Sequence, residues 1–140
     1  MLIKRATELA GLELTENQEI SVNFVGPRTM AEINEEYVGH EGVTDVISFC
    51  YIEEGDLEED DTAVDLVICT DVAYSEGTER PDSSYAEEIT LYIVHGLLHA
   101  AGEDDLDDIS RPKMRKRESE VMSVLKREFD LSAIFREKEV

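Results

Sequence analysis

The sequence predicts a single α+β domain, in which helices pack on a small mixed or mostly antiparallel β-sheet. Two observations carry this prediction. Along the 140 residues, segments with apolar side chains at helical spacing are interspersed with short runs rich in β-branched residues. One long helical segment is apolar on nearly every side, which is typical of a helix buried in the core.

The first half of the chain is predicted to form two helices and two strands. Residues 1–10 have apolar side chains at helical spacing. Residues 20–25 alternate between apolar and polar side chains and stop at a Gly-Pro pair, as a half-buried strand does. A helical period returns over residues 30–39, and residues 44–52 are rich in β-branched and aromatic residues and therefore predict a strand.

The second half begins with an acidic segment and a central strand. Seven of the nine residues in 53–61 are acidic, so this segment is expected to be an exposed loop. Residues 64–69 are apolar almost throughout, which predicts a strand in the middle of the sheet. A short helix is expected to follow through residues 72–74 and to end before a loop over 77–81.

The central helix is predicted to begin at Ser84, because Ser84 and Glu87 have the spacing of a capping box. It is apolar on nearly every side from Ile89 to Ala101. A last helix is expected from about Ser110. The side chains that it is expected to turn toward the core are Met114, Val121, Leu125 and Phe129.

The length fits one domain over residues 1–140, with residues 130–140 expected to be a C-terminal tail. The chain shows neither a secretory leader pattern nor an apolar run of membrane length, so we expect a soluble, cytoplasmic protein that binds no membrane. Cys50 and Cys69 stand alone in strand-like segments and are predicted to be buried free thiols.

The charge of the chain is strongly negative but unevenly distributed. A formal net charge of −21 argues against nucleic acid at first sight, because phosphate binding relies on Lys and Arg. Residues 111–127 nevertheless contain seven basic and two acidic residues, which gives this segment a net charge of +5 and leaves −26 elsewhere. Such a segment is most often a solvated helix face, but it can also contact phosphates.

Two histidines at the end of the central helix predict a metal site. His95 and His99 stand four residues apart, so both imidazoles lie on one helix face and can point at one object. The same pair holds zinc in the zincin metallohydrolases, where the chain then turns and supplies a third ligand. Here Gly102 supplies the turn and Asp105 is the nearest fitting carboxylate. Three protein ligands leave one position open, as in catalytic zinc sites.

Other interpretations of these residues are less favoured. A Cys₂His₂ structural zinc site does not fit, because Cys50 and Cys69 lie 19 residues apart. Ordinary peptide hydrolysis does not fit either, because Gly96 stands where zinc peptidases have their general-base Glu. Glu88 lies two turns before His95 on the same face, where it could orient a ligand or simply be a solvated residue of the first turn.

Residues 95–105, H-G-L-L-H-A-A-G-E-D-D, resemble the signature H-G-x-L-H-x-x-G-x-x-H of the YbeY-type rRNA maturation factors, which are metal-dependent endoribonucleases. Residues 44–49 resemble the T-D/N-V-L-S-F stretch of this family. Residues 64–68 are similar to its G-D-I-x-I strand, and residues 33–37 to its L-N-x-x-Y helix. The motifs agree in order and separation over roughly residues 20–128.

The chain departs from this family pattern at four positions. Asp105 stands at the third histidine, which resembles a branch that uses Asp, and a His₂Asp set is chemically sound for zinc. An anionic ligand should leave the metal a weaker Lewis acid than three neutral imidazoles would. Val38 stands where many members have an Arg thought to act in RNA cleavage, His40 where they often have Lys, and Cys50 where they usually have Pro.

The resemblance implies a single-strand-specific endoribonuclease that acts in ribosomal RNA processing, notably 3′ maturation of the small-subunit RNA, and in ribosome quality control. The implied cofactor is one Zn²⁺ ion held by His95, His99 and Asp105, with another divalent metal left open. The implied partners are single-stranded RNA or an rRNA precursor and the ribosome or a ribosomal protein, and no DNA is expected.

Four further residues are candidates for contact with the substrate. The resemblance implies Thr44 and Ser48 as hydroxyls that line the cleft, and Arg115 as an RNA contact on the basic helix. His40 could act in catalysis by contacting a phosphate or transferring a proton if its loop folds over the cleft; it could equally be an exposed histidine without a role.

Two functions of other classes stay open at this stage. A metallopeptidase-like hydrolase would share the ligand helix, although Gly96 removes its base. A non-catalytic ribosome-binding factor with a structural metal would fit Val38 and the acidic composition.

Overall fold

A computed structural model describes the fold. The described residues are 2–12, 14, 18–39, 41–51, 62–103 and 107–135. The acidic segment 53–61, His40 and Asp105 therefore lie outside the described residues.

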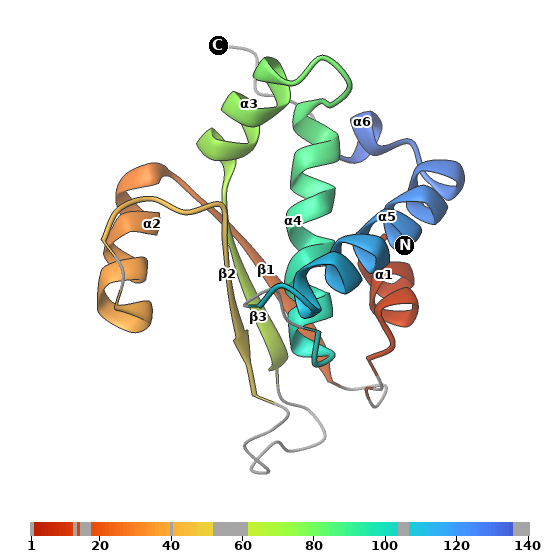
Figure 1. The fold of residues 1–140 in the computed structure, drawn as a ribbon. Coiled ribbons are helices and arrows are strands. Elements are labelled where there is room, and N and C mark those ends of the chain that lie inside the picture. Colours follow the sequence, from red (N-terminus) through yellow and green to blue (C-terminus); the bar gives the residue numbers. More distant parts are fainter. Residues whose placement is uncertain are drawn as a thin grey trace.

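A three-stranded sheet with the order β1-β3-β2 lies at the centre of the molecule (Figure 1). Strand β1 (Glu19–Val25) runs parallel to β3 (Thr62–Cys69), and β2 (Val46–Cys50) runs antiparallel to β3. The predicted mixed sheet, with residues 64–69 in its middle strand, is confirmed. Within this sheet β2 is an edge strand, so one of its sides is open.

Helices cover both faces of this sheet (Figure 1). On one face lies α4 (Tyr85–Ala100), with α1 (Leu2–Ala10), α5 (Ser110–Glu128) and α6 (Leu131–Ile134) around it. On the other face lies α2 (Pro27–Ile33), and α3 (Thr70–Glu79) continues from the end of β3. The predicted α+β class is therefore confirmed.

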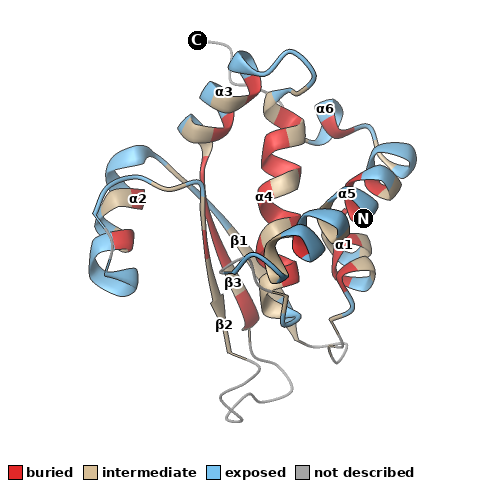
Figure 2. Cartoon of the chain, in the orientation of Figure 1, coloured by how far each residue is buried: buried red, intermediate tan, exposed pale blue. Residues whose placement is uncertain are grey.

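The alternation of side chains along β3 creates two cores. Leu66 and Ile68 point into the large core shared with α4, whereas Val67 and Cys69 face a smaller one beneath Met30 of α2. Figure 2 shows burial concentrated along β3 and α4. Because both of its faces are covered, β3 is apolar almost throughout, which is why its position in the sheet could be predicted.

Helix α4 begins as predicted. The Ser84 hydroxyl oxygen accepts a hydrogen bond of 3.2 Å from the Glu87 backbone N–H. A turn at Gly102 follows the helix, and the positive φ of 100° of this glycine lets the Glu103 N–H return to the Leu98 carbonyl at 2.9 Å. The role of Gly102 as the turn after the two histidines is confirmed.

The helical period over residues 30–39 corresponds to α2 followed by a π-helical turn, η1 (Asn34–Val38). The buried Asn34 side chain donates a 2.9 Å hydrogen bond to the Gly42 carbonyl and so ties η1 to the loop before β2. Gly39 ends the turn with a φ of 82°. This change of helix type depends on a contact that no sequence period contains.

The expectation that the helix after β3 ends before Gly77 is wrong, because α3 continues to Glu79. Gly77 lies where α3 touches the start of α4. A Cβ atom at Gly77 would lie 2.6 Å from the Ser84 carbonyl carbon and 2.6 Å from the Tyr85 nitrogen. This glycine is therefore required by close packing inside a helix and does not mark a loop.

Two features fix the chain beyond α4: hydrogen bonds from Asp107 at the start of α5, and the short final helix α6. Asp107 accepts hydrogen bonds from the backbone N–H groups of Ser110 (2.6 Å) and Ile109 (2.9 Å) at the start of α5. These bonds lower the pKa of the Asp107 carboxyl below its usual value. Within the stretch expected to be a tail, Leu131 of α6 is buried in the large core.

Cys50 and Cys69 are both free thiols, as predicted, with Cys69 buried and Cys50 half-buried. Among the helices of the described residues, none combines the length and the apolar character needed to cross a membrane.

We predict that Gly77→Ala destabilises the fold. Helix propensity alone would stabilise α3 by up to about 1 kcal/mol, whereas the clash with backbone atoms of Ser84 and Tyr85 should lower the free energy of unfolding by about 1–3 kcal/mol. Chemical denaturation decides the sign. The control is Ser75→Ala on an exposed position of α3, which should change stability by less than about 0.5 kcal/mol. A stabilised Gly77→Ala protein would contradict the close approach of α3 and α4.

Candidate functional site

One stripe of α4 reaches the surface of the molecule. From Glu88 onward this helix is buried except at Leu91, His95, His99 and the terminal Ala100. The first three stand at intervals of four residues and so share one face. The two imidazoles of this stripe are perpendicular, with ring centroids 4.5 Å apart, and their Nε2 atoms lie 3.0 Å from each other.

The donor pair fits a divalent metal ion. Two nitrogens bound to one tetrahedral zinc at about 2.0–2.1 Å lie about 3.3 Å apart, close to the 3.0 Å between Nε2 of His95 and Nε2 of His99. Within the described ranges, no group of three or more His, Cys, Asp or Glu side chains is arranged to hold a metal. The predicted third ligand, Asp105, lies outside those ranges and stays a prediction.

Glu118 of α5 contacts the imidazole of His95 at Nδ1, the ring nitrogen that does not face His99. Its Oε1 lies 2.6 Å from His95 Nδ1, and the side chains of His95 and Glu118 are only 27% and 17% exposed. In the sequence Glu118 is one of two acidic residues in a basic segment, and that composition alone gives it no role of its own. A signal was present, because Glu118 stands four residues after Met114 and three before Val121, in the apolar stripe of α5.

Gly96 explains the depth at which α4 lies on the sheet. A Cβ atom there would lie 2.5 Å from Cδ2 of the fully buried Leu66 on β3, so any larger residue would displace this methyl group. Its carbonyl oxygen also accepts a hydrogen bond of 3.3 Å from the Ser48 hydroxyl of β2. A Glu at this position, as in the zinc peptidases, would therefore require Leu66 to move.

A cavity of about 680 Å³ opens between α4 and the edge strand β2. His95 and His99 line it together with the two predicted hydroxyl residues, Thr44 and Ser48, so the structure brings these four residues together. Val38, at the position of the family arginine, also lines this cavity and is 43% exposed. The role of the hydroxyls in substrate binding stays a prediction.

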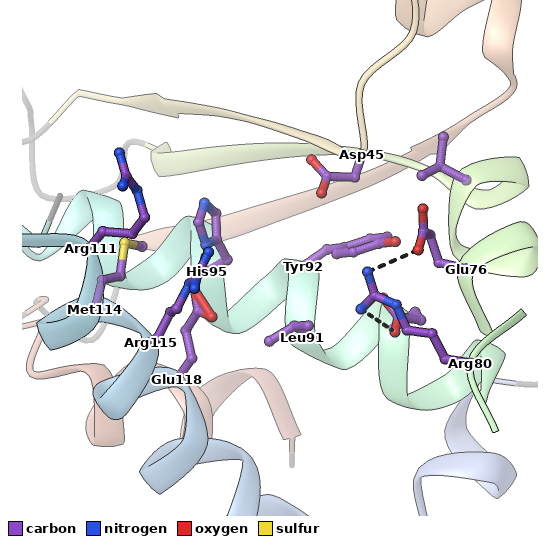
Figure 3. Close-up of a pocket in the computed structure, with 12 residues that line it drawn as sticks. Asp45, Glu76, Arg80, Leu91, Tyr92, His95, Arg111, Met114, Arg115 and Glu118 are labelled. Carbon is purple, nitrogen blue, oxygen red and sulfur yellow. Dashed lines mark hydrogen bonds and ion pairs between the residues drawn. The ribbon is translucent and has the colours of Figure 1, made fainter. Parts of the chain in front are cut away.

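A second cavity of about 400 Å³ lies on the α5 side of His95 (Figure 3). His95 and Asp45 line both cavities, so this imidazole separates them. Arg115 and Glu118 lie beside His95 in Figure 3, with Arg111 on the preceding turn of α5. Arg115 is thus adjacent to the predicted metal ligands, although its contact with RNA stays a prediction.

The far end of the second cavity is an ion-pair network, which includes Glu88. Glu88 is 3% exposed and accepts hydrogen bonds from the Ser83 hydroxyl (2.9 Å) and Arg80 (3.4 Å). Arg80 also pairs with Glu76 at 2.9 Å (Figure 3). Glu88 is therefore not a solvated residue of the first turn. Among the described residues, its hydrogen bonds are to Ser83 and Arg80 and not to a histidine.

Tyr92 fills the middle of the same cavity and is 4% exposed. Burial, followed by the negative charges of Glu88 and Asp45, raises the pKa of its phenol far above the usual value. The hydroxyl consequently stays protonated at neutral pH and can only donate or accept hydrogen bonds.

Three of the seven basic residues of α5 form ion pairs with other described residues. Arg111 pairs with Asp108, Arg117 with Glu120, and Lys126 with Glu87. Among the ion pairs between described residues, none involves the other four basic residues of this helix, which are Lys113, Arg115, Lys116 and Arg127. Of these four residues, Arg115 is the one that lines the second cavity.

Comparison with known proteins decides the family. The family model described as "Endoribonuclease YbeY" matches residues 1–126. The chain belongs to the YbeY endoribonuclease family. A YbeY endoribonuclease of Janthinobacterium sp. (strain Marseille) is 34% identical over 107 residues, which cover 76% of this chain and 68% of that protein. One from Staphylococcus carnosus (strain TM300) is 34% identical over 114 residues, covering 79% and 74% respectively.

A solved structure is similar to the whole architecture of this YbeY family member. The solution structure of TM1509 from Thermotoga maritima superimposes with a TM-score of 0.61 at 19% identity, covering 91% of this chain and 78% of that one. This likeness concerns the fold alone. The two alternatives left open by the sequence, a metallopeptidase-like hydrolase and a non-catalytic ribosome-binding factor, are not favoured by these matches.

Proposed function

We propose that the chain is a metal-dependent endoribonuclease that cleaves single-stranded RNA in the cytoplasm during ribosomal RNA processing, notably at the 3′ end of the small-subunit RNA, and in ribosome quality control. The observation that carries the proposal is the pair of Nε2 atoms 3.0 Å apart where two cavities meet. Family membership supports the reaction class, since the relatives are named as endoribonucleases.

His95, His99 and Asp105 would hold the metal ion, with Zn²⁺ as the ion best suited to this nitrogen and oxygen donor set. A divalent ion bound there supplies Lewis-acid chemistry to a phosphodiester. The protein residues supply position: the burial of α4 fixes where the two imidazoles stand, and the Ser48 hydroxyl holds β2 beside them.

The substrate would approach along the two cavities on either side of His95. Arg115, an exposed cation beside the second cavity, is proposed to contact a phosphate of the RNA. Thr44 and Ser48 are proposed to contact the RNA strand in the first cavity. His40 is proposed to contact a phosphate of the substrate or to transfer a proton. The ribosome or a ribosomal protein is the proposed partner that presents the rRNA precursor.

We predict that substitution of any of the three predicted metal ligands removes both the bound metal and the cleavage of RNA. Purified protein should bind about one Zn²⁺ per chain, and His95→Ala, His99→Ala and Asp105→Ala should each lower this content severely and reduce cleavage of single-stranded RNA at least about 100-fold. Metal analysis and a gel assay on labelled RNA measure both effects. His40→Ala should keep its zinc while cleavage falls.

The controls separate the parts of this proposal. A duplex of the same RNA sequence should survive treatment that cleaves the single strand. Stoichiometric zinc in Asp105→Ala would show that the third ligand is assigned wrongly. Intact single-stranded RNA and rRNA precursor after incubation with the metal-loaded protein would contradict the nuclease itself.

We predict that Arg115→Ala weakens RNA binding through loss of one phosphate contact. The slope of log K against log salt concentration for a labelled single strand should become shallower by about 0.7. The matched control is Arg28→Ala, which removes the same charge from α2 on the opposite face of the sheet, where Arg28 is 94% exposed. Equal slopes for the wild type and Arg115→Ala, or equal effects of both substitutions, would contradict a phosphate contact at Arg115.

A further inference from the structure

Glu118 is the one acidic side chain that α5 turns toward His95 in the described structure. It comes from a different helix, 23 residues along the chain, and reaches Nδ1 of His95 at 2.6 Å (Figure 3). This short distance is typical of a hydrogen bond to a charged group. The contact joins the most basic helix of the molecule to the helix of the predicted metal ligands.

Burying the carboxylate of Glu118 on this face of α5 would cost free energy without a hydrogen-bond partner. The neighbours of Glu118 on the inward stripe of α5, Met114 and Val121, are buried in the core. A carboxylate that is only 17% exposed has lost most of its hydration and needs a partner. An exposed glutamate such as Glu120, which pairs with Arg117 on the same helix, carries no such cost.

The contact between Glu118 and Nδ1 of His95 determines which nitrogen of the imidazole carries the proton. An ionised carboxylate can only accept, so Nδ1 of His95 donates, and the neutral ring then carries its lone pair on Nε2. That Nε2 is the atom directed at Nε2 of His99. Glu118 therefore selects the tautomer and the ring orientation that a metal ligand at His95 requires.

We propose that Glu118 is a positioning residue for His95, which fixes the imidazole through Nδ1 so that Nε2 faces the metal site before any ion binds. The inference rests on the proposed function, because it takes His95 as a metal ligand. It adds a role for α5 beyond its positive charge: the helix that carries Arg115 also sets the geometry of the ligand. Comparable outer contacts in metalloproteins raise metal affinity by about 10- to 100-fold.

Two variants and a matched control test this role. Glu118→Ala removes the acceptor, whereas Glu118→Gln keeps an acceptor oxygen of the same shape and removes the charge. Glu120→Gln removes one charge from an exposed position of the same helix. Zinc affinity by competition with a chelator should fall about 10- to 100-fold in Glu118→Ala, by less in Glu118→Gln, and not at all in Glu120→Gln.

The second readout needs no metal. In metal-free protein at pH 8, ¹⁵N NMR of the His95 ring should show the Nδ1–H tautomer in the wild type and in Glu118→Gln, and a mixture of tautomers in Glu118→Ala. Thermal unfolding of each variant tests whether it is folded. A merely structural ion pair between α4 and α5 would lower stability without changing the tautomer or the affinity.

The outcomes distinguish this inference from the proposed function. Wild-type zinc affinity in folded Glu118→Ala, or an Nε2–H tautomer of His95 in the wild type, would overturn the role of Glu118 while leaving the metal site intact. A wild-type protein that binds no divalent ion would overturn the proposed function. In that case the role of Glu118 as a positioning residue falls with it, whatever tautomer His95 adopts.

Discussion

The close packing of α4 on β3 is the constraint on which the candidate site depends. The helix lies so near the strand that a Cβ atom on Gly96, the residue after His95, would displace the Cδ2 methyl of Leu66. His95 and His99 are about one turn apart on this largely buried helix. The packing of α4 on the sheet therefore fixes the positions of both imidazoles. Gly96 also stands where a zinc peptidase has its general-base Glu, so this close contact occurs at the residue that separates the chain from that class.

Helix α5 completes the site from the opposite side with two side chains of opposite charge. Glu118 points inward to the His95 ring, and Arg115, about one turn earlier, lies on the exposed side beside the same cavity. The chain has a net charge of −21 yet belongs to an endoribonuclease family. An approaching phosphate responds mainly to the charges within about a Debye length of the site. At the second cavity these charges are mixed, with Arg80, Arg111 and Arg115 beside Asp45, Glu76, Glu88 and Glu118.

Sequence predicted those features that arise from local patterns. The N-cap at Ser84, the buried strand over 64–69 and the pair of histidines four residues apart each follow from neighbouring residues, and the structure has each of them. The Glu87 carboxylate, expected to complete a capping box, pairs with Lys126 instead. Sequence did not predict what depends on contacts between elements. The sequence predicts a loop at Gly77 because the atoms that crowd this glycine belong to Ser84 and Tyr85 at the start of the next helix. It gives Glu118 no role beyond its charge because the partner of Glu118 lies 23 residues away. The apolar stripe of α5 indicates that Glu118 faces inward, but it does not indicate which residue Glu118 contacts.

The central claim is that α4 presents two histidines that bind one divalent ion. X-ray absorption spectroscopy of the zinc-loaded protein tests it most directly, because histidine imidazoles give a characteristic multiple-scattering pattern. The account predicts two imidazoles with further oxygen or nitrogen donors, all at about 2.0–2.1 Å from the zinc. Sulfur donors at about 2.3 Å, which would implicate Cys50 or Cys69, or a spectrum without histidine scattering, would contradict it.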